Sequence, residues 1–215
     1  MYFRSMRTIF LSGFFIFISL NSISQRSFFT SADSINKGRV IGTSVGIGSA
    51  WSGTMIGLSQ IWYSEVQKSP WHSFDDSKNW LQMDKMGHFY ISHKISQFCT
   101  DKFVWSGLNN TTSTWIGAGI SIGYQTTFEF FDAYSAEWGF SWSDIAANTI
   151  GTASYTAQSL IWNEERIIPK FSYSSTEFAA IRPEVLGGTF AEALLKDYNG
   201  QTYWLSFSPG TFFKE

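Results

Sequence analysis

The residues that could do chemistry are carboxylates, one histidine and one amide in helical stretches that are otherwise apolar or small. Three predicted helices each carry a pair of them at a spacing of three or four residues, which places the pair on one helix face: Asp84 and His88, Glu129 and Asp132, and Asp144 and Asn148. An ionised group in a dry core is costly unless it is paired. We therefore expect the three polar faces to meet in one buried centre, with Lys85 or Lys94 offsetting negative charge.

Such a centre supports two kinds of role, and the residues leave both open. As a structural network it would fix how the helices pack and would catalyse nothing. As an active site it would use His88 or Glu129 as acid or base, with a pKa tuned by burial. In a metal-dependent variant, a divalent ion such as Mn, Zn or Fe would take its ligands from His88, Glu129, Asp132 and Asp144. No motif for an organic cofactor and no nucleophile elbow G-x-S-x-G is present.

Four long helices must position these residues. Runs of apolar and small residues predict core helices over about 38–64, 84–105, 113–134 and 141–165, with Ser113 or Thr114 capping the third. Pro169 is expected to end the fourth. In the tail, 170–215, we expect a short helix over about 189–196, then a turn and a strand-like run. The predicted fold is mainly α, with a four-helix bundle-like core and an irregular C-terminal tail.

The first 24 residues have the order of a signal peptide. Arg4 and Arg7 precede an apolar run over 9–20, and small polar residues follow up to Ser24. That run is shorter than the roughly 20 residues of a membrane-spanning helix. We therefore expect cleavage and a single mature helical domain over 25–215, exported to the periplasm or cell envelope. The one cysteine, Cys99, lies in a helical stretch and is expected to be buried. The apolar run is not followed by a cysteine of the kind that is acylated in lipoproteins.

The composition favours contact with lipid. Aromatic residues make up 19% of the chain and charged residues only 15%. The uncharged segment 40–64 is long enough to cross a bilayer and its glycines would allow close helix packing, although a mean hydropathy of -0.07 is too polar for an ordinary polytopic transporter. A net charge of -2 without a basic block argues against nucleic acid. The expected partners are membrane lipid or an envelope protein, and the oligomeric state is not indicated.

Aromatic residues in predicted loops and at helix ends suit a membrane interface: Trp71, Phe74, Trp80, Trp138 and Trp142. They support a binding or assembly module at the membrane surface as a further alternative.

Three segments also carry a resemblance to known families: WLQMDKMGHF, EFFDAYSAEWGFSWSDIAANTIG and DYNGQTYWLS. Together they resemble the uncharacterised YfiM-like family of predicted periplasmic lipoproteins, over about 39–206. More distantly, the polar pairs and Gly151 resemble the helical pattern of VanZ-like membrane proteins, which are linked to envelope stress and glycopeptide-antibiotic tolerance. The resemblance implies compartment and fold. Three hypotheses follow: an envelope protein with a structural polar centre, an enzyme that modifies an envelope lipid or glycan, and the membrane-surface module.

Overall fold

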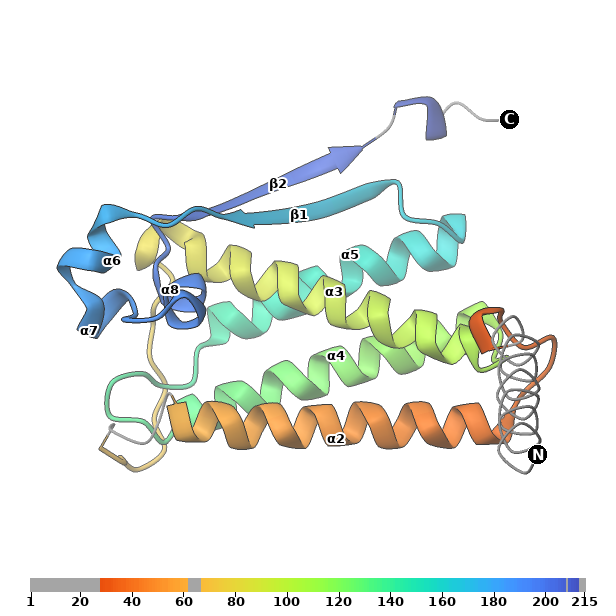
Figure 1. Ribbon diagram of the computed structural model, residues 1–215, viewed down its shortest axis with the longest axis horizontal. Coiled ribbons are helices and arrows are strands. Elements are labelled where there is room, and N and C mark those ends of the chain that lie inside the picture. The colour runs from red at the N-terminus through yellow and green to blue at the C-terminus, as the bar shows by residue number, and fades with distance from the viewer. Residues whose placement is uncertain (1–27, 62–66, 208, 213–215) are drawn as a thin grey trace, which may run out of the picture.

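Four long helices dominate the computed structural model, which describes residues 28–61, 67–207 and 209–212. They are α2 (Lys37–Ile61), α3 (Met83–Trp105), α4 (Asn110–Asp132) and α5 (Trp142–Trp162), and a short 3-10 turn, η1 (Trp80–Gln82), leads into α3 (Figure 1). The predicted mainly α fold with a bundle-like helical core is confirmed, and the predicted helix bounds differ from these by a few residues. The expected signal peptide lies outside the described residues.

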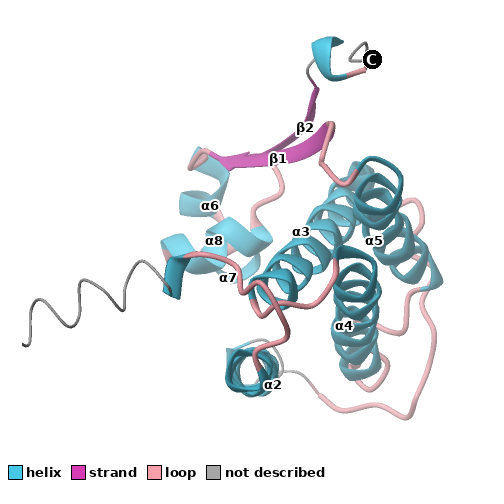
Figure 2. Ribbon diagram, turned by 90° about the vertical axis from the view of Figure 1, so that its right-hand side faces the viewer, coloured by secondary structure: helices cyan, strands magenta, loops and turns pink. Residues whose placement is uncertain are grey.

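Helices α3, α4 and α5 pack against one another as a group, and α2 stands to one side of them (Figure 2). Two glycines allow this close packing. A side chain at Gly117 of α4 would collide with Ser96 and Thr100 of α3, and one at Gly151 of α5 would collide with the backbone of Phe89. Both helices therefore lie directly on α3, as closely as small residues permit.

Helix α2 differs from what the sequence predicted. Apart from the helix's own nearby backbone, no described atom lies within 4 Å of the position that a side chain would take at its five inner glycines, Gly42, Gly46, Gly48, Gly53 and Gly57. The helix instead reaches α4 through Trp51, whose ring contacts Tyr124 at 5.6 Å between centroids. Within the described ranges, no helix combines the length and the apolar character needed to cross a membrane. The span candidate 40–64 is described as far as Ile61, as part of α2.

Side-chain caps set where the core helices begin. Asn109 Oδ1 accepts a hydrogen bond from the Thr112 amide at 2.8 Å, so α4 begins before the predicted caps Ser113 and Thr114. Ser141 Oγ accepts from the Asp144 amide at 3.1 Å and caps α5. That helix ends at Asn163, which has a left-handed conformation with φ 54°. Pro169, the expected terminator, lies further along the chain.

The C-terminal tail is more regular than predicted. Strand β1 (Ile167–Tyr173) pairs antiparallel with β2 (Gln201–Phe207), with Ile167 opposite Phe207. Three short helices connect the strands, α6 (Glu177–Ile181), α7 (Pro183–Leu186) and α8 (Phe190–Lys196), and η2 (Pro209–Thr211) follows β2. The predicted helix near 189–196 is α8, which begins with a capping box formed by Thr189 and Glu192. The two-stranded sheet lies beside α3, and β1 contacts this helix, so the tail packs against the core (Figure 1).

Candidate functional site

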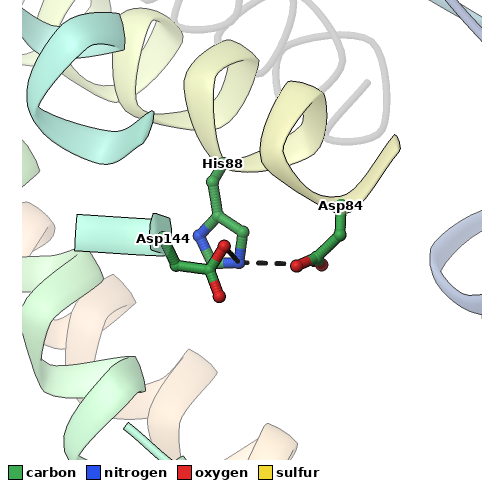
Figure 3. Close-up of side chains that lie close together, drawn as sticks. All are labelled: Asp84, His88 and Asp144. Atoms are coloured by element: carbon green, nitrogen blue, oxygen red, sulfur yellow. Dashed lines mark ion pairs between the residues drawn. The ribbon is translucent and has the colours of Figure 1, made fainter. Parts of the chain in front are cut away.

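His88 of α3 lies where the three packed helices meet. Its Nδ1 is 3.1 Å from Asn148 Oδ1 and 3.8 Å from Glu129 Oε1. Its Nε2 is 3.8 Å from Asp84 Oδ1 and 3.8 Å from Asp144 Oδ1 (Figure 3). The structure therefore brings most of the sequence-predicted candidates together around one imidazole ring.

Asp132 is placed differently from the other candidates. It is the last residue of α4 and is half-buried. In the described part of the chain, the group whose side chains could share a metal ion is Asp84, His88 and Asp144, without Glu129 or Asp132. The charge of Asp132 still acts on the centre, because it helps to raise the pKa of Glu129.

The hydrogen bond to Asn148 fixes the tautomer of His88. Asn148 Oδ1 also accepts from Gln125 Nε2 at 2.8 Å and from Ser92 Oγ at 3.3 Å. A carbonyl oxygen only accepts, so His88 Nδ1 donates its proton to that oxygen. In the neutral ring the lone pair then lies on Nε2, which faces the carboxylates of Asp84 and Asp144.

Lys85 is the ammonium of this centre. Its Nζ is 2.7 Å from Asp76 Oδ2, 2.9 Å from Asp84 Oδ2 and 2.7 Å from Asp144 Oδ1. Burial alone would lower the pKa of Lys85, but its close pairing with the three carboxylates outweighs burial and holds that pKa above the ordinary value. The sequence analysis named Lys85 or Lys94 as the residue that offsets the negative charge of the centre, and in the structure it is Lys85.

Two carboxyl groups of the centre have raised pKa values. Burial, aided by the charges of Asp144 and Asp132, raises the pKa of Glu129 to about 9. Burial also raises the pKa of Asp144 to about 6, against the lowering effect of His88 and Lys85. At neutral pH Glu129 is therefore protonated while Asp144 is largely ionised.

Two polar atoms on the Nδ1 side of His88 have no hydrogen-bond partner among the described residues. They are Glu129 Oε1 and Asn148 Nδ2, both buried. The other carboxyl oxygen of Glu129 accepts from the Ser141 amide at 3.3 Å. Buried polar atoms without partners are uncommon and costly, so these two mark where a ligand group or an ordered water would bind.

The loop before α3 and the tail complete the centre. Ser141 and Ser143 donate to Asp76 Oδ1 at 2.7 and 2.6 Å, and Tyr198 donates to Asp84 Oδ1 at 2.7 Å. Burial would raise the pKa of Asp76, but Lys85 and the hydrogen bonds from Ser143 and Ser141 hold that pKa below its ordinary value. The sequence analysis missed Asp76 and Tyr198, because neither lies in a core helix where spacing could have indicated its direction.

A second buried cluster surrounds His93, on another face of α3. His93 Nδ1 is 2.6 Å from Ser154 Oγ and His93 Nε2 is 2.6 Å from Glu165 Oε1. Gln97 also donates to Glu165, and Lys94 Nζ lies 3.7 Å from it. Although burial opposes it, the bond from His93 and the charge of Lys94 hold the pKa of Glu165 below its ordinary value. Helical spacing could not indicate this pairing, since Glu165 lies beyond the end of α5.

Comparison with known proteins gives a match to a protein family. No curated protein and no solved structure matches the chain. Residues 70–159 match the model of a family described as "Predicted periplasmic lipoprotein (DUF2279)". The segment runs from the Asp76 loop into α5, so it contains the His88 centre except for Tyr198. The predicted location in the periplasm or cell envelope is confirmed by that description. Over these residues the chain is similar to a family of predicted periplasmic lipoproteins.

Proposed function

We propose that this chain is an envelope protein that lies against membrane lipid through its apolar exterior, while its polar centre holds the helices in register. The observation that carries the proposal is an inverted distribution of polarity in α3, α4 and α5. Ser92, Ser96 and Thr114 are fully buried, whereas Trp115 and Ile150 are more than half exposed. Buried polar residues and exposed large apolar ones are the informative departures from an ordinary soluble protein.

The packing between the helices supports the same environment. Helices in lipid gain little from burying apolar side chains against each other, so they pack through small and polar residues instead. Gly117 and Gly151 provide the close approaches to α3. Hydrogen bonds between helices complete the contact, such as Ser121 to Thr152 at 2.9 Å.

One end of the bundle carries the side chains best suited to the lipid headgroup level. Trp71, Phe130 and Trp142 surround Phe140, with ring centroids 6.1, 5.8 and 5.0 Å from it. We call these four residues the aromatic cap. Trp142 is 68% exposed, Phe130 53% and Trp71 50%. Large amphipathic rings favour the boundary between water and acyl chains, so the aromatic cap is the part proposed to contact the membrane surface.

Vesicle flotation tests this proposal. The mature chain is mixed with vesicles of phosphatidylethanolamine and phosphatidylglycerol, and we expect it to float with them. The double substitution Trp71→Ser, Trp142→Ser should leave most of the protein unbound. Trp204→Ser is the control, because Trp204 is also an exposed tryptophan, at 44%, but lies in β2, outside the helices and the aromatic cap proposed to contact lipid. Wild-type protein that stays in the soluble fraction would refute the proposal.

We also propose a YfiM-like assignment and a more distant VanZ-like relationship for this chain. The segment WLQMDKMGHF, which contains Asp84, Lys85 and His88, supports a YfiM-like assignment. A more distant VanZ-like relationship is supported by the polar pairs on three helices. Both would agree with a protein that works at a membrane.

A second candidate function is an enzyme acting on an envelope lipid or glycan. The specific observation is the pair of unpartnered atoms beside His88, Glu129 Oε1 and Asn148 Nδ2. A protonated Glu129 is a general acid, and the lone pair on His88 Nε2 is a general base. The side chains of Asp84 and His88 are each 16% exposed, so the centre reaches the surface.

Product analysis separates this candidate from a purely structural centre. Envelope lipid extracts and glycan fragments are incubated with wild type and with Glu129→Gln, and new species are sought by mass spectrometry. An enzyme predicts products with wild type that the folded Glu129→Gln variant does not form. A structural centre predicts no products with either protein.

A further inference from the structure

We infer that Asp84, His88 and Asp144 bind a divalent transition-metal ion. One ligand atom from each of these side chains lies within 4.8 Å of the other two. His88 Nε2 is 3.8 Å from a carboxylate oxygen of each aspartate (Figure 3). That separation is too long for a hydrogen bond. It is close to the spacing of two ligands that each lie about 2.0–2.2 Å from a shared ion.

The orientation of His88 is the one that a metal ligand needs. Its Nδ1 proton is donated to Asn148 Oδ1, which leaves the lone pair of Nε2 directed at the two carboxylates. At metal sites the second ring nitrogen is held in this way by an acceptor, which fixes the tautomer. Tyr198 likewise donates to Asp84 Oδ1 at 2.7 Å, as partners of metal-bound carboxylates do.

The state of Asp144 is an independent indication of a missing ligand. Its side chain is only 7% exposed, and among the described residues Oδ1 has no hydrogen-bond partner, although Lys85 Nζ is ion-paired with it at 2.7 Å. The same oxygen faces His88 Nε2 (Figure 3). Lys85 shares its one positive charge among three carboxylates, so this buried oxygen is only partly compensated, and a bound cation would supply the compensation that is missing.

The charge of the surroundings also favours a cation. Three carboxylates, those of Asp76, Asp84 and Asp144, share the single ammonium of Lys85. Lys85 approaches Asp84 through Oδ2, so Oδ1 is the oxygen that faces His88. One imidazole with two carboxylates suits Zn²⁺, Mn²⁺ or Fe²⁺ and leaves coordination positions for water. The inference does not depend on lipid binding or on catalysis.

Metal titration of the purified mature chain tests the inference. After treatment with a chelator, the protein is titrated with Co²⁺, followed by its visible absorption, and Zn²⁺ is then added as competitor. We expect one ion per chain. Asp144→Asn and His88→Gln should each weaken Co²⁺ binding by more than about 10-fold, because each removes a ligand.

Asp76→Asn is the matched control. The Asp76 carboxylate lies 2.7 Å from Lys85 Nζ, as that of Asp144 does, but it is outside the metal-binding group. This variant disturbs the same ion-pair cluster and should keep wild-type affinity. Equal loss in all three variants would overturn the inference, as would wild-type protein without saturable binding or variants that bind like wild type.

Thermal unfolding keeps the test decisive if one variant folds poorly. A ligand that binds only the folded state raises the melting temperature. Zn²⁺ should raise that of wild type and of Asp76→Asn, and should leave that of His88→Gln unchanged. An equal rise in His88→Gln would place the ion elsewhere and overturn the assignment.

Discussion

The two buried histidines of α3 lie in clusters of opposite character. His93 has both ring nitrogens hydrogen-bonded, at 2.6 Å to Ser154 and 2.6 Å to Glu165. His88 has one hydrogen-bonded nitrogen, and its Nε2 faces two carboxylates at 3.8 Å. The His93 cluster is closed, whereas the His88 centre keeps atoms that nothing in the described chain pairs.

The balance of carboxylates and cations also differs between the two clusters. Glu165 is one carboxylate beside His93 and Lys94, whereas Lys85 alone serves Asp76, Asp84 and Asp144. A fully paired buried network is explained by the stability and specificity that it gives the fold. A network with excess charge and unpartnered atoms departs from that pattern, as functional sites do. We therefore regard the His93 cluster as structural, and the open contacts of the His88 centre are the basis of the proposed metal site.

Removal of the ammonium should have the largest effect. Lys85→Met would leave three buried carboxylates without their cation, and we expect a loss of about 3–5 kcal/mol in the free energy of unfolding. Lys94→Met is the control in the other cluster. Because Lys94 is 30% exposed and 3.7 Å from Glu165, its loss should cost less than about 1 kcal/mol. Urea unfolding measures both, and similar small losses would contradict the contrast.

The pH dependence of stability should have opposite signs in the two clusters. The pKa of Glu129 is raised from 4.5 to about 9, so the folded state keeps a proton that the unfolded state loses. Glu129 thus lowers stability as the pH rises from about 5 to 9, by up to about 1.4 kcal/mol per pH unit. Glu165, with its lowered pKa, adds stability above its ordinary pKa that is lost as the pH falls through its folded-state pKa.

Glu129→Gln and Glu165→Gln separate these contributions by urea unfolding across this pH range. Glu129→Gln should be more stable than wild type near pH 8 and should lose less stability as the pH rises. Glu165→Gln should be less stable at neutral pH and less sensitive to acid. A Glu129→Gln variant with the wild-type alkaline slope would show that this carboxyl is ionised in the folded protein.

Replacement of each histidine by glutamine should destabilise the protein more at His93 than at His88, the reverse of the order expected for the two lysines. His93→Gln breaks two short buried hydrogen bonds and should cost about 2–3 kcal/mol. His88→Gln loses one hydrogen bond, to Asn148, because the carboxylates lie too far from the ring to be hydrogen-bonded to it. We therefore expect a cost of about 1 kcal/mol in chelator-treated protein. Denaturant midpoints of the two variants make the measurement, and a larger loss at His88 would reverse the assignment of roles.

Helical spacing was enough to predict how the polar residues of the core meet. Pairs three or four residues apart put His88, Glu129 and Asn148 on faces that converge, because the period of a helix is 3.6 residues. Burial of Cys99 was also expected, and burial raises its pKa to about 11. Whether the converged residues bind or catalyse anything stays a prediction.

The remaining features depend on segments whose path no periodicity encodes. The loop before α3 brings Asp76 onto Lys85, and this contact decides which lysine serves the centre. The packing of α2 could not be inferred from its glycines, which face no described neighbour. Strand β1 was not predicted either, since its pairing with β2 depends on partners 28 to 40 residues away in sequence.

The smallest effect is expected where the tail joins the centre. Tyr198→Phe removes the hydrogen bond at 2.7 Å to Asp84 and should cost about 1–2 kcal/mol. Tyr173→Phe is the control, because its hydroxyl lies 3.5 Å from Asp197 and its loss should leave stability unchanged. Hydrogen exchange should show faster opening of β2 only in Tyr198→Phe. Equal exchange in both variants would mean that β2 is held by its pairing with β1, and the His88 centre would then be a property of the helices and the Asp76 loop alone.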